Sequence, residues 1–60
     1  MQIERFTTRE EAEARLHALG YVFMGAPGRW RRLTANRSSY ADVYAEGRRW
    51  VVVYHASRML

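Results

Sequence analysis

The chain contains no cysteine, no lysine and a single proline among its 60 residues. Without cysteine it forms no disulfide and no thiolate-zinc site. No apolar run approaches the roughly 18 residues that a membrane span needs. Charged Glu4 and Arg5 stand where a signal peptide would need an apolar segment. We therefore expect a soluble, cytoplasmic protein that does not interact with a membrane.

Residues 1–60 are long enough for one compact domain with a thin core, because a chain of this length buries only about 60% of its unfolded surface. Hydrophobic residues make up 48% of the chain, and 13% of the residues are aromatic. This composition is too apolar for a disordered tail. One helix on one sheet is the largest architecture that we expect.

Arginine supplies all ten basic residues, and against six acids it gives a net charge of +4. The charge is unevenly placed, because residues 1–20 hold three Arg and four Glu, whereas residues 21–60 hold seven Arg against Asp42 and Glu46. Codon bias in a GC-rich genome is one alternative explanation of the missing lysine, but it does not explain this asymmetry. A positive field of this kind attracts polyanions or acidic protein surfaces.

The clearest local pattern is TTREEAEARLHALG, which predicts a helix over residues 8–19. Thr8 and Glu11 have the spacing of a capping box, and Gly20 suits a left-handed helix end. Glu11 and Arg15 are spaced for an i,i+4 ion pair. Ala12, Leu16 and Leu19 form one narrow apolar stripe, so we expect one face of the helix to be buried.

The rest of the chain alternates with a period of two, which indicates strands. We expect strands at residues 3–6, 21–24, 30–34, 40–45 and 49–55, a type II turn at residues 26–29, a polar loop at residues 36–39 and a turn at residues 46–47. The predicted fold is α+β, with one N-terminal helix packed on one face of an antiparallel sheet of three or four strands in β-α-β-β-β-β order.

The last hairpin decides which side chains share a face. A two-residue loop at 46–47 places Val43 opposite Trp50 and Ala41 opposite Val52, whereas a three-residue loop with a glycine bulge shifts the pairing by one. The first register puts Ala41, Val43, Trp50, Val52 and Tyr54 toward the helix, and Tyr40, Asp42, Tyr44, Arg49, Val51, Val53 and His55 on the opposite face. A single short helix covers only one face. The other face is then an interaction surface, including a homodimer interface, or simply a set of good strand formers that tolerate water.

Catalytic and metal-binding patterns are weak. His17 and His55 lack further ligands at metal spacing, so we expect no metal and no cofactor. Ser57, His55 and Asp42 do not occupy the rigid turn and cleft of a nucleophilic site. The chain resembles the HicA-type toxin ribonucleases in length and in combining a helix with antiparallel strands. Those enzymes use a histidine that follows a glycine early in the sheet, whereas Gly28 is followed by Arg29 and Trp30. We therefore predict a protein that is not an enzyme.

Direct RNA or DNA binding is the alternative function. The stretch GRWRRLTANR brings together Arg29, Arg31, Arg32 and Arg37, which Arg48, Arg49 and Arg58 join if the strands lie side by side. Trp30, Tyr40 and Tyr44 are candidates for stacking on unpaired bases. Strand alternation, however, sends Arg29 and Arg31 to one face and Trp30 and Arg32 to the other, and no helix-turn-helix, RNP or GXXG motif is present.

The segments FTTREEAEARLHALGY, GRW and WVVVY, in a very short chain without catalytic motifs, resemble the small proteins of phages and mobile elements, among them the anti-CRISPR proteins. The resemblance implies an inhibitor that covers a site on a host protein or nucleoprotein complex. A chain at +4 differs from the acidic members that mimic nucleic acid. The candidate binding residues are Arg29, Trp30, Arg31, Arg32, Arg48, Arg49, Tyr40 and Tyr44. Trp30 and Trp50 are alternatively core residues, since each buries about 200 Å².

Overall fold

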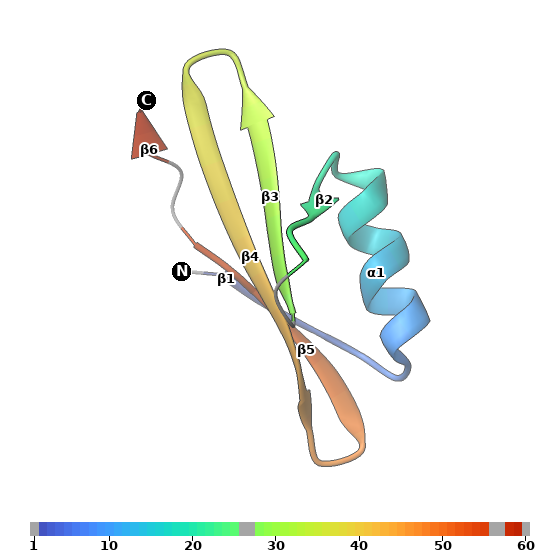
Figure 1. The fold of residues 1–60 in the computed structure, drawn as a ribbon. Helices are drawn as coiled ribbons and strands as arrows, with labels where there is room; N and C mark the ends of the chain where they lie inside the picture. The colour runs from blue at the N-terminus through green and yellow to red at the C-terminus, as the bar shows by residue number, and fades with distance from the viewer. Residues whose placement is uncertain (1, 26–27, 56–57, 60) are drawn as a thin grey trace.

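The computed structural model describes residues 2–25, 28–55 and 58–59, which form an α+β fold (Figure 1). The elements in chain order are β1 (Gln2–Phe6), α1 (Arg9–Ala18), β2 (Val22–Phe23), β3 (Arg29–Thr34), β4 (Arg37–Glu46), β5 (Arg49–Tyr54) and β6 (Arg58–Met59). No helix in the described part of the chain is long and apolar enough to cross a membrane.

The sheet is antiparallel, with strand order β1-β5-β4-β3-β2, and β6 pairs with the start of β4. The prediction of three or four strands is therefore wrong. The first strand pairs along its whole length with β5, from Gln2 opposite Tyr54 to Phe6 opposite Trp50. The local sequence pattern identified this strand but did not place it in the sheet, because the residues it pairs with are 44 (Phe6–Trp50) to 52 (Gln2–Tyr54) positions away in the chain.

Both ends of α1 are capped as the sequence predicts. The Thr8 hydroxyl accepts a hydrogen bond from the Glu11 amide at 3.2 Å and lies 3.1 Å from the Glu11 carboxylate. At the other end Gly20 has a φ of 90°, and the amides of Gly20 and Tyr21 donate to the carbonyls of His17 and Leu16. This is a Schellman motif, which satisfies carbonyls that the helix leaves without partners.

The predicted Glu11–Arg15 ion pair is wrong. Arg15 instead reaches Glu4 on β1 at 3.5 Å, while the helix pair is Arg9–Glu13 at 3.0 Å. Glu11 interacts with Thr8 at the start of the helix, and Arg15 interacts with Glu4 on β1. The spacing of residues along the helix does not reveal these two alternative partners.

The predicted polar loop at residues 36–39 is also wrong, because the turn consists of Ala35 and Asn36 and β4 begins at Arg37. Ala35 has a φ of 49°, which a short hairpin loop demands. Ser38 and Ser39 are buried and pair with Leu33 and Arg32. Pairing along the full length of β3 therefore overrides the low strand propensity of these serines.

The turn of the last hairpin is at Gly47 and Arg48, one residue later than predicted. Val43 consequently lies opposite Val52 and Ala41 opposite Tyr54, a shift of two residues from the predicted pairs. Because side chains alternate with a period of two, this shift leaves every residue on its predicted face. The predicted turn at 26–29 lies partly outside the described residues, and Gly28 within it has the expected positive φ of 75°.

The buried cluster is made of Ala12, Leu16, Tyr21, Trp30, Ala41, Val43 and Val52. The cluster combines residues of α1 with residues of β3, β4 and β5, and α1 runs along one side of the sheet in Figure 1. Ala12 and Leu16 are fully buried members of the cluster, as the helical stripe predicts. The side chains of the opposite sheet face point away from this cluster.

Candidate functional site

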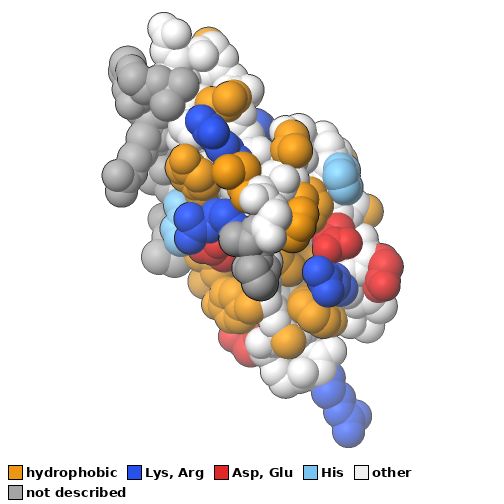
Figure 2. All heavy atoms as spheres, in the orientation of Figure 1, with side chains coloured by type: hydrophobic (Ala, Val, Ile, Leu, Met, Phe, Trp, Pro, Cys, Tyr) orange, Lys and Arg blue, Asp and Glu red, His pale blue; other side chains and the backbone are white. Residues whose placement is uncertain are grey.

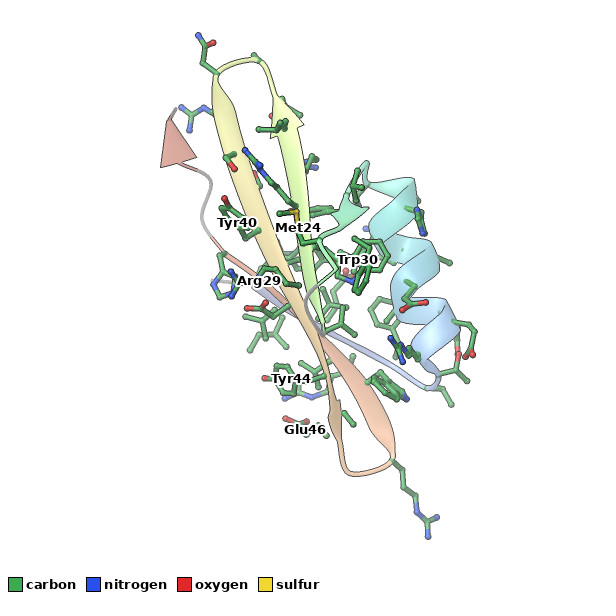
Figure 3. All side chains as sticks on the ribbon, in the orientation of Figure 1. Met24, Arg29, Trp30, Tyr40, Tyr44 and Glu46 are labelled. Carbon is green, nitrogen blue, oxygen red and sulfur yellow. The ribbon has the colours of Figure 1, made fainter. Side chains whose placement is uncertain are left out.

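The sheet face turned away from α1, here called the open face, is the candidate site. The pairing registers place on it Ile3, Arg5, Val22, Arg29, Arg31, Leu33, Ser38, Tyr40, Asp42, Tyr44, Glu46, Arg49, Val51, Val53 and His55. Figure 3 shows Arg29, Tyr40 and Tyr44 on the side of β4 opposite to Trp30, which points toward the helix. The predicted division of residues between the two faces is thus confirmed for the last hairpin.

Arg29, Arg31 and Tyr40 form a cation-aromatic cluster at the centre of β3 and β4. The guanidinium carbons of Arg29 and Arg31 lie 5.7 Å and 6.0 Å from the centre of the Tyr40 ring. Arg31 is directly opposite Tyr40 in the register, and Arg29 follows on the same face two residues away. These distances are in the range of cation-π attraction, which fixes long side chains that otherwise sample many rotamers.

Asp42 connects this cluster to His55. One carboxylate oxygen accepts from Arg29 Nε at 2.7 Å, and the other lies 2.7 Å from His55 Nε2. Burial acts to raise the pKa of Asp42, but the hydrogen bonds from His55 and Arg29, together with their charges, outweigh it and lower the pKa below its ordinary value of 3.8. Asp42 is therefore ionised at neutral pH and serves as a fixed acceptor that orients Arg29.

The valines at the middle of the open face are sealed by their neighbours. Val51 and Val53 are 1% and 7% exposed. The Arg5–Glu46 ion pair of 3.1 Å joins β1 to β4 and so spans β5 next to Val51. The expectation that the apolar groups of this face stay uncovered is correct only for part of them, since Ile3, Val22, Leu33 and Tyr44 remain exposed.

Trp30 and Arg32 point to the helix side of the sheet, and their side chains make contacts within the fold. Trp30 is 3% exposed, and its ring meets those of His17 and Phe23 at 5.1 Å and 5.5 Å. Arg32 donates from a terminal nitrogen to the Leu19 carbonyl at 3.2 Å. Its guanidinium also lies 4.9 Å from the Tyr21 ring. Two of the eight candidate binding residues therefore lie on the helix side of the sheet, as strand alternation predicts, and not on the open face.

Arg48 and Arg49 lie at the far tip of the last hairpin. Arg49 pairs with Glu46, four residues along β4 from Asp42, which is the register partner of Arg29. At about 3.3 Å per residue, the Arg49–Glu46 pair lies roughly 13 Å along the strands from the Arg29–Asp42 pair. These exposed arginines therefore extend the positive surface but do not join the Arg29–Tyr40–Arg31 cluster. The side chain of Arg58 lies outside the described residues.

Charge is divided between the two sides of the molecule. The open face holds Arg5, Arg29, Arg31 and Arg49 against Asp42 and Glu46, whereas α1 holds more acids than arginines. Figure 2 shows blue arginines among orange apolar side chains over the strands, with some red atoms beside them, and two red acidic side chains next to a blue arginine over the helix. An anionic partner is therefore attracted to the sheet and not to the helix.

A pocket of about 300 Å³ lies on the helix side, and its lining includes Glu4, Arg15 and Tyr54. The Tyr54 hydroxyl donates to Glu4 at 2.5 Å, and burial followed by this bond raises the pKa of Tyr54. Glu4 also pairs with Arg15, so these two charged side chains that line the pocket interact with each other. Among the described residues no group of three His, Asp or Glu side chains is arranged to hold a metal ion.

No protein-family model, curated protein or solved structure matches this chain. A function has to be argued from the residues of the site.

Sequence reasoning missed the role of Asp42 and His55 in orienting Arg29, and the exposure of Val22 and Leu33. Alternation already puts Asp42 on the face of Tyr40, but the shared contact with Arg29 depends on the β3–β4 register. Val22 lies opposite Arg31, and Leu33 follows Arg31 on the same face. The signal that could have found both apolar residues is the same alternation, extended through residues 22–33.

Proposed function

We propose that this protein is a non-enzymatic binding protein that docks on a host protein or nucleoprotein complex through the open face of its sheet, with α1 packed on the other face. In this proposal it is a phage-type inhibitor of the anti-CRISPR kind, and it acts in the host cytoplasm by covering a site on the complex. The Arg29–Tyr40–Arg31 cluster carries the proposal.

The cluster supports binding because both guanidinium groups are held by their inner nitrogens. Arg29 Nε is bound to Asp42 and Arg31 Nε to Ser38, the latter at 3.3 Å. In the part of the chain that the structure describes, their terminal nitrogens make no hydrogen bond and remain as donors for an anionic group. Side chains fixed before binding lose little entropy on association, and arginine and tyrosine are frequent hot-spot residues.

Capture of the partner from host lysate tests the proposal. Arg29→Gln combined with Arg31→Gln removes both terminal donor sets, and we expect this variant to lose capture of a defined complex that the wild-type protein retains after nuclease treatment. Arg9→Gln is the matched control, because Arg9 is an exposed arginine on α1 and interacts with Glu13 and Trp50. Equal capture by all three proteins would remove the open face from the function.

Direct RNA or DNA binding is the second candidate, and the exposure of Tyr44 on the same face as Arg29 and Arg31 favours it. A direct binder retards labelled RNA or DNA without other proteins, and its affinity falls steeply as the salt concentration rises. We expect the docking protein to leave free nucleic acid unshifted at physiological salt. A salt-dependent shift that the double variant abolishes would support the second candidate instead.

A further inference from the structure

Arg31 is surrounded on the open face by Val22, Leu33 and Tyr40, from β2, β3 and β4. Val22 lies opposite Arg31 on β2, and Tyr40 lies opposite it on β4. Leu33 is the next residue of β3 on the same face. Val22 and Leu33 are 65% and 57% exposed, and Tyr40 is partly buried. We call Val22, Arg31, Leu33 and Tyr40 the Arg31 patch.

The position of Arg31 within this patch favours a carboxylate as its ligand. Ser38 and Tyr40 hold the inner part of the guanidinium. The two terminal nitrogens then form a planar fork that matches the two oxygens of a carboxylate. A partner that covers Val22 and Leu33 removes water around this pair, and a desolvated Arg–carboxylate contact is stronger than an exposed one.

Resting on the proposed function, we infer that the Arg31 patch anchors the docking contact and that its occupant is a protein surface presenting one Asp or Glu flanked by apolar side chains. A nucleic-acid strand would pair its phosphates with Arg31 but would leave Val22 and Leu33 against a hydrated sugar-phosphate backbone. A second copy of this chain would bring two arginine-rich faces together, which like-charge repulsion opposes.

Selection from a display library of random peptides, with the tagged protein as bait, tests this inference directly. We expect enriched peptides to contain an Asp or Glu between apolar residues. The best synthetic peptide should bind the Arg31→Gln variant at least roughly thirtyfold more weakly, as for a hot-spot arginine. Leu33→Ser should also weaken binding, whereas Arg9→Gln should leave it unchanged. Circular dichroism establishes that each variant is folded.

Three outcomes would overturn the inference: enrichment of acidic runs without apolar neighbours, no enrichment at all, or displacement of the selected peptides by oligouridylate. Light scattering that shows a dimer abolished by Arg31→Gln would assign the patch to a second copy. The failure of this inference is separable from failure of the proposed function. If the double arginine variant loses capture of the host complex while the library yields nothing, docking through the open face stands and the carboxylate partner is wrong.

Discussion

Replacement of Gly28 by alanine tests how the chain positions Arg29. Gly28 has a φ of 75°, and its carbonyl accepts a 2.7 Å hydrogen bond from the Val43 amide. A Cβ at this position would fall well inside contact distance of the Val43 carbonyl oxygen. The Val43 carbonyl is a backbone group, and the position of the added Cβ is fixed by the backbone of residue 28, so neither can rotate away. The bend at Gly28 leads directly into the β3 residues that face Asp42 and Tyr40.

The magnitude follows from two contributions to the free energy of unfolding. A left-handed backbone costs an alanine about 1–2 kcal/mol, and forcing an atom into a filled space costs about 1–3 kcal/mol more. A domain of this length has a total stability of roughly 3–9 kcal/mol, so Gly28→Ala should remove a large part of it. Each kcal/mol corresponds to a fall of about 4–8 °C in Tm.

Gly47→Ala is the matched control. Gly47 has a φ of 61°, and no described atom lies within 4 Å of the position of its added Cβ. Gly47→Ala therefore costs only the free energy of the left-handed backbone and adds no steric clash. Urea denaturation followed by circular dichroism measures both variants, and we expect Gly28→Ala to be less stable than Gly47→Ala by about 1–3 kcal/mol. Equal losses at the two glycines would refute the reasoning.

Three further predictions concern charged and polar groups. Arg32→Gln should lower the free energy of unfolding by about 1.5–3 kcal/mol, because it removes the charged donor from the Leu19 carbonyl; a change below 0.5 kcal/mol in urea denaturation, about the size of an ordinary surface substitution, would contradict this role. The lowered pKa of Asp42 stabilises the fold above the ordinary pKa of 3.8, and this contribution is lost as the pH falls through the lower, folded-state value. Asp42→Asn should therefore show a shallower acid loss of stability than the wild-type protein, and identical acid profiles would argue against the contacts with Arg29 and His55. Tyr54 has a raised pKa, so Tyr54→Phe should remove the part of the tyrosinate absorbance that appears at the highest pH in an alkaline titration; an unchanged titration curve would contradict burial of this phenol.

The two ends of the helix and the division of strand residues between the two faces follow from the sequence by itself. Thr8 and Gly20 determine where the helix begins and ends, because a hydroxyl cap and a positive φ are properties of single residues and their nearest neighbours. Alternation separates Arg31 from Arg32 for an equally local reason: consecutive strand residues point to opposite faces whatever the partner strand is. For the same reason, an error of two residues in the last hairpin did not disturb the faces.

The tertiary structure alone decided which groups meet. Glu4 and Tyr54 are hydrogen-bonded although they are fifty residues apart in the chain. Asp42 joins Arg29 to His55 only because β3, β4 and β5 lie side by side in this register. Such contacts depend on strand order and on the length of each pairing, which arise from burial summed over the whole domain. No short stretch of the chain contains that information.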